Sequence, residues 1–285
     1  MKPAPAAGTL TVVATSLGNA ADLSARAISV LRDADVIVAE DTRSARQLLA
    51  GIGGNPTTRV LSCFDANEAA RAAEIGALLA GGARVALISE AGTPLVSDPG
   101  YRVVAAAIAA GARVVPVPGP SALLAALVAA GLPTDKFLFL GFPPRKSGAR
   151  RRLFESVRAL PFTLVLYESP LRAGATLADL AATLGARRRG CLARELTKPH
   201  EEIVRDDVGA LAARYATQRP LGEVTLVIEG ATGGVRDDLD DEALVERARE
   251  MIATGKSTRD AATDLAALSG RPRRDVYKLI TSDRD

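Results

Sequence analysis

The chain has 285 residues, 48% hydrophobic and 24% charged, which is ordinary for a globular protein and excludes a largely disordered one. This length predicts two domains with a small appendage. Two cysteines and a single histidine exclude a disulfide framework, a Cys-rich zinc site and a multi-histidine metal site, and a reducing cytoplasm is the plain expectation. The longest uncharged run, 114–134, contains four prolines and is not expected to span a membrane.

The net charge is +3, and thirty of the thirty-six basic residues are arginine. Arginine binds phosphate through a bidentate fork, so the bias is a mild indication of nucleic-acid binding. A GC-rich genome that prefers arginine codons explains the same bias equally well.

The first half of the chain alternates short apolar runs with alanine-rich helical segments. We expect strands at 9–15, 35–39, 59–62, 84–89 and 113–117, and helices at 22–33, 43–50, 67–80 and 101–110. Nearly all-apolar strands that alternate with helices indicate a mostly parallel sheet covered by helices on both faces. The sequence therefore predicts the α/β class.

A stiff turn at 117–120 marks an expected domain boundary, beyond which the second half repeats the pattern. We expect strands at 136–140, 162–167, 190–194 and 223–229, and helices at 150–160, 171–184 and 207–215. The composition changes at 230–241, which is typical of a linker. The predicted α/β domains therefore span 8–120 and 121–232.

Three helices are expected in a tail at 238–285, over 242–253, 258–268 and 273–281. A compact unit of this kind is similar to a helix-turn-helix module, which binds nucleic acid. A packing or dimerisation bundle is about equally expected.

Three loops that follow predicted strands carry turn-forming and polar residues. The longest is SEAGTPLVSDPG (89–100), and the others are PGPSA (118–122) and TSLGN (15–19). Ligands of open α/β sheets bind beyond the carboxyl ends of strands, so these loops predict a cofactor or nucleotide cleft. None is a G-x-G-x-x-G fingerprint, which disfavours a Rossmann dinucleotide site.

Further polar segments lie at EDTR (40–43), YESP (167–170) and RELTKPHE (194–201). The paired carboxylates of EDTR could act in acid–base chemistry, but capping of a helix is the favoured interpretation. The single histidine, His200, is expected on the surface rather than in catalysis.

Basic residues form three clusters, each of which alone would be an ordinary solvated surface. They comprise Arg145, Lys146 and Arg150–Arg152; Arg187–Arg189; and Arg271, Arg273 and Arg274. Together they favour contact with RNA or DNA. Only 4% of residues are aromatic, so base stacking is not indicated.

These motifs, together with DLSARAISVL (22–31), PVPGPSA (116–122) and GEVTLVIEG (222–230), occur in the order of a known family. The chain resembles the ribosomal RNA small subunit methyltransferase I family of the tetrapyrrole-methylase superfamily, over residues 8–232 and the helical tail. The resemblance implies two α/β domains with S-adenosylmethionine (AdoMet) in the cleft between them, and no metal. It also implies a homodimer that 2′-O-methylates a cytidine of small-subunit (16S) ribosomal RNA near the decoding centre.

The resemblance also implies roles for individual residues. Cofactor contacts map to Gly92, Thr93, Val96, Ser121, Ala122, Tyr167, Ala193 and Thr225. Three positions depart from the family pattern: Ser16 replaces proline, Glu90 replaces aspartate and Leu171 replaces histidine.

A ribose hydroxyl needs a positioned base, and the sequence leaves the choice open. The candidates are Lys198, which Glu195 would orient, and the carboxylates of Glu40, Asp41 and Glu168. The predicted RNA-binding residues are Arg43, Arg145, Lys146, Arg150 and Arg151. Two other functions remain open: an AdoMet-dependent methylase of a porphyrin-like small molecule, and a non-catalytic RNA-binding assembly factor.

Overall fold

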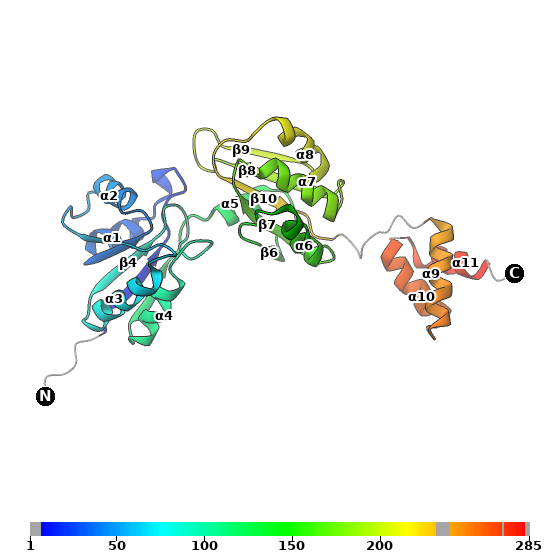
Figure 1. Ribbon diagram of the computed structural model, residues 1–285, viewed down its shortest axis with the longest axis horizontal. Coiled ribbons are helices and arrows are strands. Elements are labelled where there is room, and N and C mark those ends of the chain that lie inside the picture. Colours follow the sequence, from blue (N-terminus) through cyan, green and yellow to red (C-terminus); the bar gives the residue numbers. More distant parts are fainter. Residues whose placement is uncertain (1–6, 232–239, 270, 283–285) are drawn as a thin grey trace.

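A computed structural model describes residues 7–231, 240–269 and 271–282, which form two α/β lobes and a three-helix module (Figure 1). The first lobe contains a parallel sheet with the strand order β3-β2-β4-β1-β5. Its strands are β1 (Thr9–Val13), β2 (Val36–Ala39), β3 (Arg59–Ser62), β4 (Arg84–Ile88) and β5 (Arg113–Val117). The predicted parallel sheet is thus confirmed.

Helices cover both faces of this sheet, as expected from its apolar strands. After the short 3-10 turn η1 (Ala20–Asp22), the helices are α1 (Ala25–Asp33), α2 (Thr42–Gly51), α3 (Glu68–Ala80) and α4 (Tyr101–Ala109). One apolar core joins α1 and α2 to the sheet, and a second core joins α3 and α4 to its other face. Because both faces are buried, the strands lack the apolar–polar alternation of a half-exposed sheet.

Side chains fix where the helices of the first lobe begin. The Ser24 hydroxyl accepts a hydrogen bond from the Ala27 amide at the start of α1 (3.1 Å). The Glu68 carboxylate accepts hydrogen bonds from the amides of Gly100 (2.8 Å) and Arg102 (3.0 Å) at the start of α4. These oxygens satisfy helix-terminal amides that have no partner within the helix.

The second lobe has the strand order β6-β7-β10-β8-β9. Its strands are β6 (Phe137–Phe139), β7 (Thr163–Glu168), β8 (Arg189–Arg194), β9 (Glu202–Asp207) and β10 (Val224–Ile228). Only β6 and β7 pair in parallel, whereas the pairings β7–β10, β10–β8 and β8–β9 are antiparallel. The second half therefore does not repeat the parallel sheet of the first.

Strand β9 was not predicted, because its sequence EIVRDD carries four charges. It is an edge strand, where charged side chains face water and protect an open row of backbone groups. The loop between β8 and β9 is short, so it returns the chain antiparallel, whereas a parallel pairing needs a long crossover.

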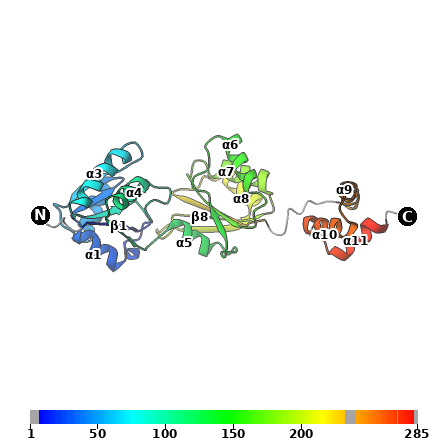
Figure 2. The same ribbon diagram turned by 90° about the horizontal axis from the view of Figure 1, so that it is seen from below.

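Helices α6 (Ser147–Val157), α7 (Ala173–Leu184) and α8 (Val208–Thr217) cover one face of the second sheet, and α5 (Ala122–Ala129) covers the other (Figure 2). Helix α5 directly follows the last strand of the first lobe, yet its Leu123 and Leu127 pack against Val165 and Val227 of the second sheet. Leu17, from the loop after β1, belongs to the same core. This core therefore joins the two lobes.

The third unit consists of α9 (Asp241–Ala253), α10 (Thr258–Ser269) and α11 (Arg273–Ser282), and it stands apart from the lobes in both ribbon views. It has a core of its own, which includes Leu244, Leu265, Val276 and Ile280. Most of the predicted linker at 230–241, with the domain limits at 232 and 238, lies outside the described residues. Among the helices that the structure describes, none combines the length and apolar character needed to cross a bilayer.

Candidate functional site

The three predicted loops meet at the carboxyl edge of the first sheet. The Thr15 amide donates to the Gly92 carbonyl (2.8 Å), and the Thr93 hydroxyl donates to the Pro120 carbonyl (3.0 Å). At Gly92 the backbone has φ +76°, and an added Cβ would lie 3.0 Å from Leu17. The three loops can approach one another this closely only because residue 92 is a glycine and has no side chain.

A cavity of about 420 Å³ lies between these loops and the second lobe. The first lobe and α5 contribute Leu17, Ala91–Thr93, Val96–Asp98 and Ala122 to its walls. The second lobe contributes Phe142, Tyr167–Pro170, Glu195, Lys198 and Gly222–Thr225. This size is typical of a cavity for a small molecule or cofactor.

Six of the eight predicted cofactor residues line this cavity: Gly92, Thr93, Val96, Ala122, Tyr167 and Thr225. The other two lie directly behind the wall. Ser121 is the N-cap residue of α5, and Ala193 is a fully buried neighbour of Thr225 across the sheet. The resemblance therefore selected residues that the fold brings together from two lobes.

Tyr167 occupies the centre of the wall contributed by the second lobe. It pairs with Thr225 across the sheet, and its ring lies 5.0 Å from that of Phe139 and 5.6 Å from that of Phe142. Its hydroxyl accepts a hydrogen bond from the Leu123 amide at the start of α5 (3.1 Å). Burial raises the pKa of the Tyr167 phenol, so it is neutral at physiological pH.

Strained backbone lies on both sides of the cavity. In the first lobe, Leu95 and Ser97 have φ of 71° and 70°, and in the second lobe Glu195 and Thr197 have φ of 49° and 67°. Side chains other than glycine rarely adopt this conformation, and such residues cluster at ligand sites. The residues that follow these two pairs, Asp98 and Lys198, both line the cavity.

Lys198 carries a positive charge that two carboxylates hold in place. Its ammonium nitrogen lies 3.0 Å from Glu195 Oε1 and 3.7 Å from Glu223 Oε2. Burial lowers the pKa of Lys198, but the hydrogen bond to Glu195 and the charge of Glu223 outweigh it and raise that pKa above its usual range. At neutral pH the side chain is therefore a cation, with no free electron pair to accept a proton.

Gly18 lets Lys198 bridge the lobes. An added Cβ on Gly18 would lie 2.4 Å from Lys198 Cγ, so the lysine stem rests directly on the TSLGN loop. The prediction that Glu195 orients Lys198 is consistent with this arrangement.

Glu168 lines the cavity, but its carboxylate is fully engaged within the second lobe. It accepts hydrogen bonds from the Ser169 amide (2.8 Å), the Thr176 hydroxyl (2.6 Å) and the Arg172 guanidinium (2.8 Å), and its side chain is 0% exposed. These contacts position the YESP turn.

Glu40 and Asp41 do not line this cavity. Asp41 accepts a hydrogen bond from the Arg43 amide (2.7 Å) at the start of α2, which confirms the capping interpretation, and it lines a separate hollow of about 110 Å³. Glu40 is exposed as a residue. Partial burial of its carboxyl, and then the charge of Glu90, raise the pKa of that carboxyl. Arg43, at the end of the same motif, is 91% exposed in its side chain.

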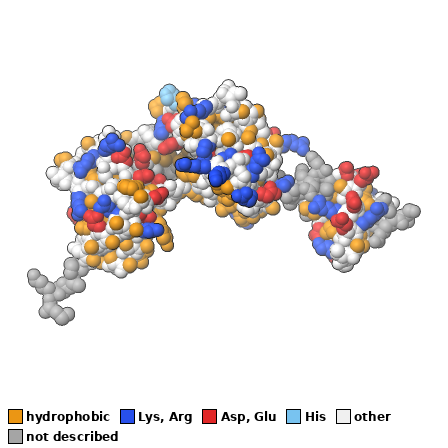
Figure 3. All heavy atoms as spheres, viewed as in Figure 1, with side chains coloured by type: hydrophobic (Ala, Val, Ile, Leu, Met, Phe, Trp, Pro, Cys, Tyr) orange, Lys and Arg blue, Asp and Glu red, His pale blue; other side chains and the backbone are white. Residues whose placement is uncertain are grey.

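A basic face lies on the second lobe, in the segment that follows the cavity-lining Phe142. Arg145, Lys146 and Arg152 are exposed, and Arg151 is 55% exposed in its side chain. Figure 3 shows Lys and Arg side chains gathered on the second lobe where it adjoins the first lobe, and acidic side chains on the facing edge of the first lobe. We call the exposed residues of 145–152 the basic face.

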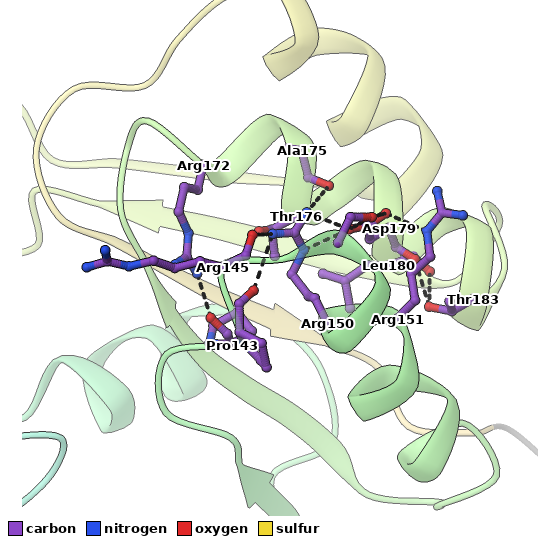
Figure 4. A network of polar contacts seen from close by, with 12 residues as sticks. Pro143, Arg145, Arg150, Arg151, Arg172, Ala175, Thr176, Asp179, Leu180 and Thr183 are labelled. Carbon is purple, nitrogen blue, oxygen red and sulfur yellow. Dashed lines mark hydrogen bonds and ion pairs between the residues drawn. The ribbon is translucent and has the colours of Figure 1, made fainter.

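Arg150 does not belong to this face, contrary to the prediction. Its side chain is 5% exposed and forms a buried ion pair with Asp179 at 2.5 Å (Figure 4). Asp179 also accepts hydrogen bonds from the Ser147 hydroxyl (2.9 Å) and from Arg151 Nε (2.6 Å). Arg150 lies at a buried position of α6, so it holds the basic face in place from behind.

Residues of the other two basic clusters, 187–189 and 271–274, also form ion pairs or hydrogen bonds within the chain. Arg189 pairs with Glu229 at 2.7 Å, and Arg188 donates to backbone carbonyls. Arg271 pairs with Asp241. Arg273 and Arg274 are exposed, and so is His200, as predicted.

The structure adds Leu17, Asp98, Phe142 and Glu223 to the cavity, to which the sequence had assigned no role. Asp98 belongs to the SDPG motif, so its position in a loop rich in turn-forming residues was the available signal. Glu223 belongs to the GEVTLVIEG motif, whereas Phe142 lies outside any motif and is brought in by the fold alone.

Comparison with known proteins places this geometry in a family. The family model for Tetrapyrrole (Corrin/Porphyrin) Methylases matches residues 9–212. A protein of Mesorhizobium japonicum named ribosomal RNA small subunit methyltransferase I is 43% identical over 97% of this chain and 92% of its own length. Proteins of the same name from Synechocystis sp. and Escherichia coli O157:H7 are each 42% identical over 95% of this chain, and over 97% and 94% of their own lengths.

Solved structures share the fold at lower identity. A conserved hypothetical protein from Aeropyrum pernix aligns over 98% of this chain and 97% of its own, with a TM-score of 0.61 and 20% identity. A uroporphyrin-III C-methyl transferase from Thermus thermophilus, complexed with S-adenyl homocysteine, aligns over 77% of this chain and 97% of its own, with a TM-score of 0.51 and 23% identity.

Proposed function

The chain belongs to the ribosomal RNA small subunit methyltransferase I family of the tetrapyrrole methylases, and we propose that it transfers a methyl group from AdoMet to small-subunit ribosomal RNA in the cytoplasm. The acceptor is the ribose 2′-hydroxyl of a cytidine near the decoding centre of 16S rRNA. The motifs EDTR and SDPG, which by the family resemblance are specific to this branch of the superfamily, support this acceptor.

One observation carries the proposal: the second lobe lines a cofactor-sized cavity and also carries an exposed basic face. The cavity supplies a site for a methyl donor, and the basic face supplies contacts for phosphates. A methylase of a small tetrapyrrole has no need of the second feature.

The cavity fits AdoMet on chemical grounds. Apolar side chains of Leu17, Val96 and Phe142 suit an adenine ring, while Thr93 and Thr225 bring hydroxyls close to it. Loop backbone at Gly92 approaches without a side chain in the way. When bound, AdoMet supplies a methyl group attached to a positively charged sulfur, and this sulfur is a good leaving group because it departs as a neutral thioether.

The residues of the chain then act mainly by alignment. Holding the ribose oxygen in line with the methyl carbon contributes about 7–11 kcal/mol to lowering the barrier. Arg43, Arg145, Lys146 and Arg151 bind RNA phosphates, and the Lys198 ammonium attracts the backbone towards the cavity. Closure of the lobes around the nucleotide excludes water.

We also propose that the chain acts as a homodimer. Large apolar side chains are exposed on α4 (Tyr101, 75%, and Ile108, 64%) and on α5 (Val128, 74%, and Leu124, 50%). Exposed apolar patches are typical of protein interfaces. Sedimentation of the full chain tests this: a monomer at all concentrations contradicts it.

Two measurements test the main proposal. Calorimetry with AdoMet is expected to show binding, and a chain that binds RNA but not AdoMet would be a non-catalytic assembly factor. Transfer of labelled methyl is then compared among unmethylated small ribosomal subunits, naked 16S rRNA and a tetrapyrrole. Transfer to rRNA alone, mapped to a cytidine 2′-oxygen, is the expected result, whereas transfer to the tetrapyrrole alone would refute it.

A further inference from the structure

The ionisable side chains that line the cavity differ in whether they have a partner of opposite charge. Glu168 is paired with Arg172, and Glu195 and Glu223 share Lys198. These carboxylates already bind cations, so accepting a proton from a substrate would disrupt an ion pair that the fold has built.

Asp98 is the exception among the cavity-lining carboxylates that the structure describes. No ion pair among the described residues includes it, and the charged groups that act on it most strongly are acidic. The Lys198 cation lines the same cavity but is paired with Glu195 and Glu223. The neighbours of Asp98 from other elements are Glu40 after β2, Glu90 after β4, Glu223 before β10, Tyr167 on β7 and Ser89 at the end of β4. The Ser89 hydroxyl, which donates to the carbonyls of Ala91 and Gly92, lies near enough to favour the ionised form.

The backbone holds Asp98 at the cavity by strained geometry. Leu95 and Ser97, which precede it, both have φ near +70°. Behind the loop, Glu68 fixes the Gly100 amide at 2.8 Å. A fixed position is what a base needs, because proton transfer requires hydrogen-bond distance to the hydroxyl.

We propose that Asp98 is the general base of the methyl transfer. This proposal rests on the proposed function, because it requires a ribose 2′-hydroxyl as acceptor. As the hydroxyl oxygen forms its bond to the methyl carbon, the methyl–sulfur bond breaks and its electron pair remains on sulfur. The hydroxyl proton moves to a carboxylate oxygen of Asp98, which later releases it to water.

The electrostatic surroundings suit this role. Burial, followed by the charge of Glu40, raises the pKa of Asp98 to about 6, partly offset by the nearby Ser89 hydroxyl. A carboxylate of this kind is ionised at neutral pH yet is a better proton acceptor than an ordinary aspartate.

A second role for Asp98 would be to attract the positive sulfonium of AdoMet, and the two roles differ in what they do to binding. A base acts on the hydroxyl only, so its loss leaves the affinities for AdoMet and for S-adenosylhomocysteine unchanged. A carboxylate that pairs with the sulfonium favours AdoMet over the neutral thioether, so its loss weakens AdoMet binding selectively.

The test uses the full chain with Asp98→Asn, Asp98→Glu and the control Asp33→Asn, an exposed carboxylate of the same lobe that does not line the cavity and is not among the charged neighbours of Asp98. Single-turnover methyl transfer to the rRNA substrate is followed from about pH 5 to about pH 9, with calorimetry for both cofactor forms. For Asp98→Asn we expect a 10²–10⁴-fold loss of rate, unchanged affinities and no acidic limb in the pH profile. The control keeps its rate and the limb near pH 6.

Asp98→Glu keeps a carboxylate on a longer stem and is expected to recover part of the rate with the limb restored. Three results would overturn the assignment of Asp98 as the general base. They are an Asp98→Asn rate within about threefold of the parent, an acidic limb that persists in the pH profile of that variant, or a selective loss of AdoMet affinity. If the parent chain binds AdoMet but methylates no rRNA, the proposed function itself fails, and the base fails with it. That outcome is distinct, because it appears before any substitution is made.

Discussion

Asp98 and Lys198 show how neighbouring charges set the chemistry of single residues in this cavity. Each follows a residue with positive φ, and each lies on a loop from a different lobe. Burial and then acidic neighbours raise the pKa of Asp98, and acidic neighbours also stabilise the charge of Lys198. Negatively charged surroundings therefore make Asp98 a better proton acceptor on one wall and keep Lys198 a cation on the other.

Asp98→Asn is expected to stabilise the folded chain at neutral pH while reducing its activity. The folded-state pKa of about 6 lies above the ordinary value of 3.8. The contribution of Asp98 to the free energy of unfolding is therefore fully present below pH 3.8 and is lost as the pH rises through 6. The amide should raise the free energy of unfolding at pH 7 by about 3 kcal/mol, and by only about 0.5 kcal/mol near pH 4. Urea titrations at both pH values measure this, and a destabilised variant at pH 7 would contradict it.

Lys198→Met is expected to affect RNA binding more than the chemical step. A cation that attracts phosphate contributes equally to the ground state and the transition state, so its loss raises KM for rRNA by about tenfold and changes kcat by less than about threefold. Steady-state kinetics separate the two constants. If the variant instead turns over roughly a hundredfold more slowly with KM unchanged, Lys198 acts on the reacting atoms.

At the scale of elements, the α6–α7 pair shows how a basic surface is supported by a buried acid. Asp179 on α7 binds Arg150 and Arg151 on α6, and it also binds Ser147 at the start of α6 (Figure 4). Burial alone would raise the pKa of Asp179, but these hydrogen bonds outweigh it and lower that pKa below its usual value. The ion pair thus fixes the helix that carries the basic face.

Asp179→Ala is expected to lower the free energy of unfolding by about 3–5 kcal/mol, because it leaves the buried Arg150 guanidinium without its counter-charge. Urea denaturation measures the loss. Glu155→Ala is the matched control on the same helix pair, since Glu155 pairs with Arg158 at a surface where both side chains are about half exposed. Its removal should cost less than about 1 kcal/mol, and an equal cost for both variants would refute the distinction.

At the scale of the whole molecule, the chain combines a two-lobed cavity with a separate helical module. The lobes share the core around α5, whereas the module has a core of its own. Exposed Arg273, Arg274 and Lys278, with the exposed Asp275 among them, give α11 a net positive surface. This arrangement suits a module that adds contacts to RNA without taking part in the cavity.

A chain that ends at residue 231 is therefore expected to bind AdoMet with unchanged affinity but rRNA about tenfold more weakly, with a salt dependence shallower by about one to two phosphate contacts. Fluorescence titrations at several salt concentrations measure this. Arg273→Ala with Arg274→Ala in the full chain should reproduce most of the effect. If truncation leaves RNA affinity unchanged and yields monomers, the module is the dimerisation bundle that the sequence also allowed.

The sequence by itself determined the strands and helices of the first lobe and the loops at its carboxyl edge, because these depend on local periodicity and short motifs. The family resemblance, rather than periodicity, indicated the residues proposed to contact the cofactor. Only the tertiary structure decided which charged residues are available. Arg150 is buried because Asp179 of another helix pairs with it, and Lys198 is held as a cation partly by Glu223 from a distant segment. Glu168 is engaged by Arg172 and Thr176 at the start of the next helix. The tertiary structure likewise made the second sheet mixed and left Asp98 facing the cavity, since pairing and burial arise only when separate elements meet.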